Sequence, residues 1–502
     1  MKRISRIIFP TVVVVVAIGA FACGGHYNLL QQQRSLFRNH QVAHNGLWLQ
    51  EARGDGNVQK PSGLQTAADD NLSDIFQSDS PYGTFQNVYQ LLKDQYVEGI
   101  PSDTPLAYGA AEALLGSLDE PNSRFIEPAE RRALDDQDNG VYQGAGILFT
   151  VRKQTDSDLV IRKITTVDVV PGSPAEKAGI VTGDVVTEID HHWIIAYDPI
   201  QADAKLFKKL AKDEVGLEKE YTSIENKIKN GISLAKAQAQ LNAPDTAPLV
   251  LTVERAGEPK PLTFSLDVSQ PTRSDSATWK TLPDGSGYIR ILSFNNNTVA
   301  QFDKALASLA SASGIVLDLR DCPGGQLTPA LAIANSMAPG TELGRIVVRD
   351  NRAKNVDPTM GFGTKVQPLK STPNTPVLKN SYHGKIVVLI NNATANTAEL
   401  LAAFLHDRVG ARMAGTSTFG DATAQTLFPM SDGSAFTLTT GVLQTASGKS
   451  FNLAGIVPDV PVADSAIRRD GDQAVAKAEA LLSLPPLKVE ASRPAEPPTL
   501  SL

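Results

Sequence analysis

Two short polar segments hold the residues whose types could do chemistry. One runs from Asn391 to Glu399 and places Asn396 directly before an apolar, helix-like stretch; the other begins at Thr418 and places Asp421 after a glycine. The amide nitrogen of Asn396 is not a nucleophile, and its oxygen forms no acyl intermediate. An ionised Asp421 could accept a hydrogen bond from that amide. The pair therefore predicts a polar contact and not an activated nucleophile with its base.

Several side chains near these segments offer an alternative nucleophile or base. Simple structural roles account for each of them: a hydroxyl at a helix start caps the helix, a cysteine beside glycines fills a small space, and a histidine followed by charged residues ends a solvated helix. No residues assemble into a metal site or a phosphate loop. The alternative candidates are Thr394, Thr397, Ser417, Thr418, Cys322, His383 and His406.

Composition is typical of a globular protein with more than one domain. The chain has 502 residues, of which 42% are hydrophobic and 20% are charged, and its net charge is -7. That length predicts two or three domains, and the apolar content suffices for sizeable cores. A mildly acidic chain without a basic run argues against nucleic acid as a partner. Only two cysteines are present, which excludes a disulfide framework.

The N-terminus has the pattern of an export signal. Lys2 and Arg3 precede an apolar run from Ile7 to Ala22, which is shorter than the about 20 residues of a relaxed membrane span. Cys23 follows this run and resembles a bacterial lipid-attachment site. Three alternatives remain open: a lipid anchor at Cys23, a cleaved signal and an uncleaved anchor. All three place the bulk of the protein outside the cytoplasm, in the periplasm or the cell envelope.

Periodicity and turn residues divide the rest of the chain. Apolar residues at helical spacing predict an N-terminal helical segment, and glycine-punctuated strands follow it. Strands and helices then alternate from Tyr288 to Leu405, which is typical of an α/β layer with a largely parallel sheet. The predicted fold class is a multidomain α/β and β protein. The expected boundaries are 1–23 for the signal or anchor, 24–81 for a flexible tether, 82–139 for the helical segment, 140–270 for a β domain with a helical insertion at 199–244, 271–483 for the α/β core and 484–502 for a disordered tail.

Several motifs, in order, resemble those of the C-terminal-processing, or tail-specific, serine peptidases of bacteria and chloroplasts. The resemblance extends from Phe85 to Val462. It implies a PDZ domain with a helical insertion and an α/β peptidase-fold core. The motifs are a helix end at 117–119, the glycines of 144–147, the PDZ-like stretches 172–179 and 183–184, the Pro-Gly-Gly loop within 317–325, Thr-Phe-Gly at 418–420 and the segment 455–459.

The resemblance assigns both polar residues to the family's working positions. The family's nucleophile segment runs Ser-Ala-Ser-Ala-Ser-Glu, and alignment on Glu399 puts its reactive serine at Asn396. The family's lysine base follows Thr-Phe-Gly, and that position is Asp421 here. Gln425 stands where the family keeps a glutamine that orients the lysine. The resemblance thus implies a peptidase fold whose serine–lysine dyad is replaced.

The resemblance also implies two sites made by the backbone. An oxyanion-like site would use the main-chain amides of Gly324, Gly325 and Thr397. A PDZ groove would pair an extended peptide with a free strand edge and capture the terminal carboxylate of that peptide on loop amides. The expected peptide-binding residues are Gln143, Gly144, Ala145, Gly146, Ile147 and Phe149.

Three functional hypotheses follow. The first is an exported pseudopeptidase that binds protein C-terminal tails or unfolded polypeptides without cutting them, as an adaptor or regulator of an active peptidase relative. The second is an active serine-type endopeptidase with a relocated nucleophile, such as Thr397. The third is an envelope scaffold, for which the apolar stripe of the 199–244 insertion would pair with a copy of itself or with a partner. The favoured interpretation of that stripe is a helical hairpin that folds on its own PDZ domain. No cofactor or metal is expected for any of them.

Overall fold

The computed structural model divides the chain into two units. One is Gly25–Ser117, and the other contains the remainder of the chain; each is described by itself. The predicted lipid site at Cys23, and most of the predicted tether, insertion and tail, lie outside the described residues. The described residues are 81–97, 99–100, 102–118, 120, 122–156, 159–195, 229–245, 247–350, 363–463 and 472–488.

Two helices form the described part of the N-terminal unit. Helix α4 spans Pro81–Gln95 and helix α5 spans Asp103–Gly116. Ser102 is the N-cap of α5, since its hydroxyl accepts a hydrogen bond from the Thr104 amide. The apolar residues that the sequence places at helical spacing therefore belong to two helices and not to one. Gly99, at a φ of 69°, lies between them. No helix in the described part of the chain is long and apolar enough to cross a membrane.

A six-stranded sheet forms the centre of the second unit. Its order is β10-β11-β12-β15-β16-β19, in which β10 is antiparallel to β11 and the other neighbours are parallel. Its central strands β12 and β15 are fully buried, and apolar apart from Asp318, because a parallel sheet is covered on both faces. The strands are β10 (Ala277–Thr281), β11 (Gly287–Ile291), β12 (Ile315–Asp318), β15 (Ile386–Ile390), β16 (Arg412–Gly415) and β19 (Val460–Pro461).

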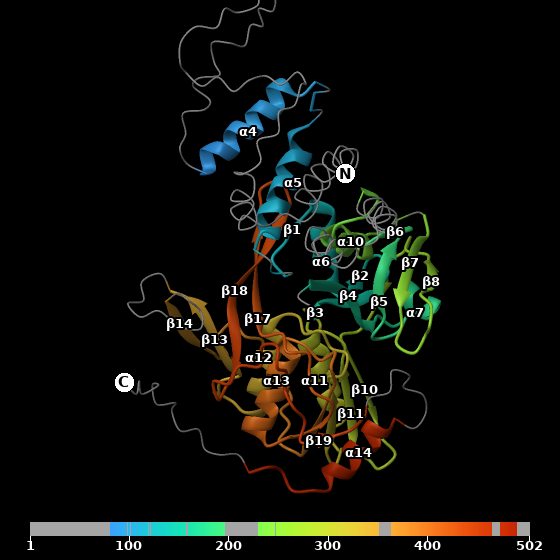
Figure 1. The fold of residues 1–502 in the computed structure, drawn as a ribbon. Coiled ribbons are helices and arrows are strands. Elements are labelled where there is room, and N and C mark those ends of the chain that lie inside the picture. The colour runs from blue at the N-terminus through green and yellow to red at the C-terminus, as the bar shows by residue number, and fades with distance from the viewer. Residues whose placement is uncertain are drawn as a thin grey trace, which may run out of the picture. The chain divides into compact units, whose positions relative to one another are not determined.

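Helices cover the two faces of this sheet (Figure 1). Leu317 and Val388 pack in a buried cluster with residues of three helices. Their neighbours Val316 and Val387 pack against a fourth helix, because successive side chains of a strand point to opposite faces. The first three helices are α11 (Thr298–Ser308), α12 (Leu327–Met337) and α13 (Thr397–Phe404), and the fourth is α14 (Gln473–Leu482).

A second, antiparallel sheet is organised around the long strand β18. This strand pairs with β1, β13 and β17, and β14 pairs with β13. The sequence pattern predicted none of these strands, because their residues are largely polar or half-exposed and show no long apolar run. The strands are β1 (Phe125–Ile126), β13 (Gly344–Arg349), β14 (Thr364–Leu369), β17 (Thr423–Pro429) and β18 (Ala435–Thr445).

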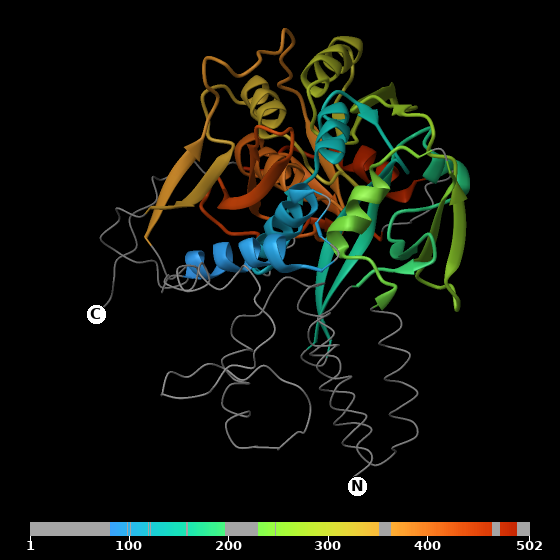
Figure 2. The same ribbon diagram turned by 90° about the horizontal axis from the view of Figure 1, so that it is seen from above.

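A third sheet, with two short helices, forms the predicted β domain. Its order is β3-β4-β5-β7-β8, with β6 paired to β5, so β3 is an edge strand. Helix α10 contributes the buried Ala237 and Leu241 to this domain's core and lies alongside the β3–β4 hairpin (Figure 2). The elements are β3 (Ile147–Asp156), β4 (Leu159–Val169), α7 (Pro174–Ala178), β5 (Val185–Ile189), β6 (His192–Trp193), α10 (Leu234–Leu241), β7 (Leu249–Glu254) and β8 (Leu262–Leu266).

The predicted fold class is confirmed, with one local difference at the start of the β domain. The sequence predicted a single strand from Val141 to Thr150, but the structure has two, β2 (Val141–Tyr142) and β3. Gly144 and Gly146 each adopt a φ of 69°, which breaks an extended strand. The short strand β2 pairs with β9 (Thr272–Arg273) instead, directly after helix α6 (Pro128–Gln137).

The most buried ion pair of the core gives a stability prediction. Arg320 is 1% exposed and lies 2.5 Å from Asp318 and 2.7 Å from Asp472. Replacing Arg320 with Met leaves the fully buried Asp318 without its cation, and we expect a loss of about 3–5 kcal/mol in the free energy of unfolding. Asp472→Asn is the matched control, because it removes only the more exposed carboxylate. Denaturant titration should show a clearly smaller loss for the control; equal losses would contradict this account.

Candidate functional site

The candidate site lies where the central strands of the parallel sheet end. Asn396 follows β15 and begins α13, and the Pro-Gly-Gly loop follows β12, the neighbouring strand. A Cβ atom on Gly324 would lie 2.9 Å from both the Ala395 carbonyl oxygen and the Thr397 amide nitrogen. The glycine therefore permits the loop to pack directly against the turn that holds Asn396. Carboxyl ends of parallel strands are the usual place for a binding site in such sheets.

The backbone at Asn396 is strained. Its φ is 51° and its ψ is -116°, a conformation that residues with a side chain rarely adopt. Holding a non-glycine residue there costs about 1–3 kcal/mol and requires support from the surroundings. The turn thus projects one side chain sharply at the start of a helix, which is the arrangement that a peptidase needs for its nucleophile.

That support comes from the Glu399 carboxylate, which is fully buried. It accepts hydrogen bonds from the amides of Asn396 (2.9 Å), Gly420 (2.8 Å) and Asp421 (2.9 Å), and from the Thr418 hydroxyl. These bonds fasten the Asn396 turn to the segment that carries Asp421. Burial raises the pKa of Glu399 to about 7, and the four hydrogen bonds oppose that rise. Sequence reasoning used Glu399 only to align the segment, and its function as an acceptor was missed.

The structure brings Asn396 and Asp421 together, but through the main chain. The side-chain amide nitrogen of Asn396, Nδ2, donates to the main-chain carbonyl oxygens of Thr423 (2.7 Å) and Asp421 (3.4 Å). The Asp421 carboxylate accepts from the amide (2.9 Å) and hydroxyl (2.6 Å) of Thr423. Burial raises the pKa of Asp421, while the Thr423 hydrogen bonds and a weaker contribution from Asn396 lower it. Thr423 is the central partner of both residues, and no motif in the sequence identified it.

Gln425 belongs to a neighbouring part of the same polar network. Its amide nitrogen donates to the hydroxyls of Thr439 (2.7 Å) and Thr423 (3.2 Å). Thr439 in turn donates to Glu120 at 2.7 Å, and the charge of Glu120 further raises the pKa of Asp421. The glutamine therefore lies near the candidate site, although its partners are threonine hydroxyls.

The expected oxyanion-like site of Gly324, Gly325 and Thr397 stays a prediction, and the structure places the glycine loop against Thr397. Within the described residues, the amides of Gly325 and Thr397 donate to no main-chain or side-chain acceptor, and both belong to the turn and loop that meet at Asn396. The Thr397 hydroxyl donates to the Gly325 carbonyl at 2.9 Å and so joins the two segments. Amides held in this way are suited to bind a carbonyl oxygen of an extended chain.

Among the alternative nucleophiles, the three threonine hydroxyls are hydrogen-bonded to structural acceptors and the Cys322 thiol is neutral. The hydroxyls of Thr397, Thr394 and Thr418 donate to Gly325, Leu319 and Glu399 respectively, and thus serve structural acceptors. Cys322 is fully buried, and burial raises its pKa to about 12, so its thiol stays protonated at neutral pH. Ser417 is exposed.

Neither histidine of the sequence hypotheses is placed as a base for these groups. His406 lies in the π-helical turn η1 (Leu405–Val409), with its Nδ1 2.8 Å from Asp407 and its Nε2 3.2 Å from Asp459. Both imidazole nitrogens therefore face carboxylates, which raise the pKa of His406. His383 is exposed.

A cavity of about 280 Å³ connects the glycine loop to the β domain. Gly324 and Gly325 line one side, and the β3 residues Ile147, Leu148 and Phe149 line another. The open edge of β3 therefore shares a cavity with the loop that packs against Asn396. Arg152, further along β3, donates to the Asn392 carbonyl at 2.7 Å and lies over the Phe419 ring. These contacts hold β3 beside the candidate site.

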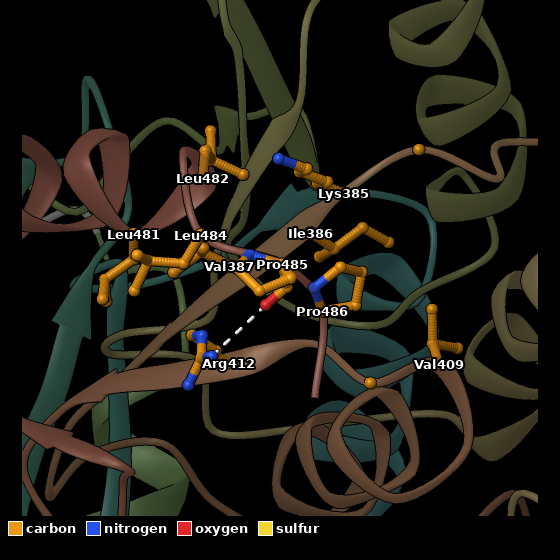
Figure 3. Close-up of a pocket in the computed structure, with 12 residues that line it drawn as sticks. Lys385, Ile386, Val387, Val409, Arg412, Leu481, Leu482, Leu484, Pro485 and Pro486 are labelled. Atoms are coloured by element: carbon orange, nitrogen blue, oxygen red, sulfur yellow. Dashed lines mark hydrogen bonds between the residues drawn. The ribbon is translucent and has the colours of Figure 1, made fainter. Parts of the chain in front are cut away.

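A smaller pocket of about 20 Å³ lies elsewhere in the core (Figure 3). Ile386 and Arg412 line it at the amino ends of β15 and β16, whereas Asn396 follows the carboxyl end of β15. Arg412 donates to the Pro485 carbonyl at 3.2 Å, and the Leu487 amide donates to Gly410 at 3.0 Å. The start of the predicted tail is thus bound to the core at this pocket, which is remote from the candidate site.

Comparisons with known proteins agree with this architecture. Residues 285–462 match the model of peptidase family S41, and residues 165–206 match a PDZ domain. Residues 285–462 thus form a peptidase family S41 domain, and a PDZ domain precedes it. The family resemblance predicted from the motifs is therefore confirmed, together with the PDZ domain.

The relatives of this S41 chain are carboxy-terminal processing proteases. It is 28% identical over 384 residues to the carboxy-terminal-processing protease of Bartonella bacilliformis, which covers 75% of this chain and 74% of that protein. It is 28% identical over 381 residues to the chloroplastic C-terminal processing peptidase of Tetradesmus obliquus, which covers 74% of this chain and 71% of that protein. It is also similar to the solved photosystem II D1 C-terminal processing protease (24% identity, 76% of this chain, 87% of that chain, TM-score 0.49).

The Glu399 carboxyl gives a pH prediction. Its pKa is about 7 in the folded protein against 4.5 ordinarily, so between those values the folded chain holds a proton that the unfolded chain has lost. The free energy of unfolding should therefore fall as pH rises through this range. Glu399→Gln should flatten that slope, and it should also lower stability by about 1–3 kcal/mol because an amide offers one acceptor to several donors.

Denaturant titrations at pH 4.5 to 7 measure both effects. Glu254→Gln is the matched control, since that carboxyl is 54% exposed on β7, and it should leave the slope unchanged. An unaltered slope in Glu399→Gln would show that Glu399 does not titrate in this range.

Proposed function

We propose that this S41 chain is an exported pseudopeptidase that binds protein tails or unfolded polypeptides and does not cleave them. The proposal is supported by the presence of Asn396 and Asp421 where the family resemblance expects the serine nucleophile and the lysine base. Asn396 occupies the strained turn at the start of α13, and Asp421 occupies the adjoining segment, 25 positions later. Neither side chain can attack a peptide carbonyl.

The main-chain groups and the cavity around Asn396 and Asp421 support binding without cleavage. The amides of Gly325 and Thr397, the cavity beside them and the β3 edge are features that hold an extended chain. Amides of this kind give only a small part of the rate enhancement when the nucleophile and base are missing. A protein of this type suits the task of an adaptor that presents polypeptides to, or regulates, an active peptidase relative.

The decisive measurement is turnover of unfolded protein substrates. We expect the purified chain to cleave casein and a reduced, unfolded protein no faster than buffer, and to resist labelling by a fluorophosphonate probe. Activity in the wild type that disappears in Thr397→Ala and persists in Thr397→Ser would instead establish Thr397 as a relocated nucleophile. Wild-type binding to the same unfolded proteins, measured by fluorescence anisotropy, is required by the proposal.

Restoring the dyad tests whether the frame is still fit for chemistry. We expect the double variant Asn396→Ser with Asp421→Lys to react with the fluorophosphonate probe, because the turn and the oxyanion-like amides are retained. The matched control is Asn396→Ala with Asp421→Lys, which has the same lysine but no hydroxyl and should not react. Equal labelling of the two variants would mean that position 396 no longer presents a side chain for attack.

A further inference from the structure

The loop expected to capture a terminal carboxylate is already bonded within the PDZ domain. The Ala145 amide donates to the Leu241 carbonyl, the last residue of α10, at 2.9 Å. The Ala145 carbonyl accepts from the Ala175 amide at 3.1 Å, and the Gly146 carbonyl accepts from the Val170 amide at 2.9 Å. An amide that already serves a helix end is not available to an incoming carboxylate. The end of α10 therefore closes the predicted capture loop at Ala145, one of its amides.

Close packing maintains this closure. A Cβ atom on Gly144 would lie 2.3 Å from the Leu241 carbonyl oxygen, and one on Gly146 would lie 2.3 Å from the Ser173 Cβ. The two glycines thus allow the loop to fit between the end of α10 and the start of α7. Opening the loop would require movement of α10, whose Ala237 and Leu241 are buried in the domain core.

The electrostatics at the loop also disfavour a free carboxylate. The C-terminal end of a helix has a partial negative charge, and that end of α10 contacts the loop. Asp138 lines the adjoining cavity, and Asp136 accepts a hydrogen bond from Gln143 at 2.8 Å. Among the described residues that line the cavity, Arg124 is the one cation, and it lies 2.7 Å from Glu130. A bound terminal carboxylate would find negative groups and no uncommitted positive charge there.

The strand edge itself remains open to pairing. Among the described strands, β3 pairs only with β4, and Ile147 to Phe149 line the cavity that leads to Gly324 and Gly325. Main-chain pairing along such an edge needs an extended segment but no chain end. The structure therefore retains the part of the groove that binds a backbone and has closed the part that recognises a terminus.

We propose that the PDZ domain of this chain binds internal extended segments of unfolded polypeptides and does not select free C-termini. The inference rests on the proposed peptide-binding function and names the class of ligand that this groove takes. It separates the two partner classes expected from the sequence, favouring unfolded polypeptides over C-terminal tails.

A matched set of peptides tests the proposal on the full chain. A fluorescein-labelled peptide of alternating valine and threonine, which favours the extended conformation, is made as the free acid, as the C-terminal amide and with a Gly-Ser extension at that end. We expect the three dissociation constants, measured by anisotropy, to agree within about twofold. A preference of about tenfold or more for the free acid, equal to about 1.4 kcal/mol, would overturn the inference and leave the proposed function standing. Absence of binding by all three would overturn both.

A variant locates the binding site. Asn242, the residue that ends α10, lines the cavity next to the loop. Asn242→Lys places a cation there and should create a several-fold preference for the free acid over the amide, whereas the neutral Asn242→Gln should not. If Asn242→Lys binds the free acid and the amide equally, the absence of a positive charge at this loop is not what prevents selection of a chain end, and the electrostatic argument is wrong. Circular dichroism of both variants confirms that the domain stays folded.

Discussion

The geometry around Asn396 depends on one buried carboxylate. Glu399 accepts three main-chain amides and one hydroxyl, and these donors come from the Asn396 turn and from the segment 418–421. A carboxylate is suited to this task because its two oxygens offer several acceptor positions in one small space. The start of α13 and the Asp421 segment are thus held in register by a group that itself does no chemistry. Its burial and its hydrogen bonds oppose each other, which makes this part of the fold sensitive to pH.

The strained turn at Asn396 persists without a nucleophile to justify it. Its cost of about 1–3 kcal/mol is offset by the Glu399 bonds and by close packing on Gly324. The Asn396 side chain stabilises this turn, since its side-chain amide donates a hydrogen bond to the Thr423 carbonyl at the beginning of β17. Asn396 and Asp421 are therefore held by a local hydrogen-bond network within the peptidase-fold frame.

The glycine loop and the edge of strand β3 line the same cavity, and their main-chain groups give the proposed binding function its physical basis. The glycine loop offers amides, and β3 offers an unpaired strand edge. Both are suited to a polypeptide backbone and neither depends on particular side chains of the ligand. In the proposed binding mode, the contact of α10 with Ala145 reduces the ability of the Gly144–Gly146 loop to distinguish a chain end from a chain interior. The two proposals therefore describe one groove, which is broad in what it accepts and lacks the means to cut.

The sequence by itself determined many of the elements and the two domains. Apolar runs such as Ile386–Ile390 predicted the parallel sheet, and ordered motifs predicted the PDZ domain and the peptidase-fold core. The family resemblance predicted that Asn396 and Asp421 stand at the working positions, and the structure brings these two residues together. The sheet around β18 was missed because its half-exposed, threonine-rich strands have weak periodicity. Only the tertiary structure decided which atoms these residues contact. The side chain of Asn396 binds main-chain oxygens of Thr423 and Asp421, and the Ala145 amide binds the Leu241 carbonyl instead of staying free for a ligand. Such partners are far apart along the chain, and their pairing is set by how helices and strands pack, which local residue patterns do not encode.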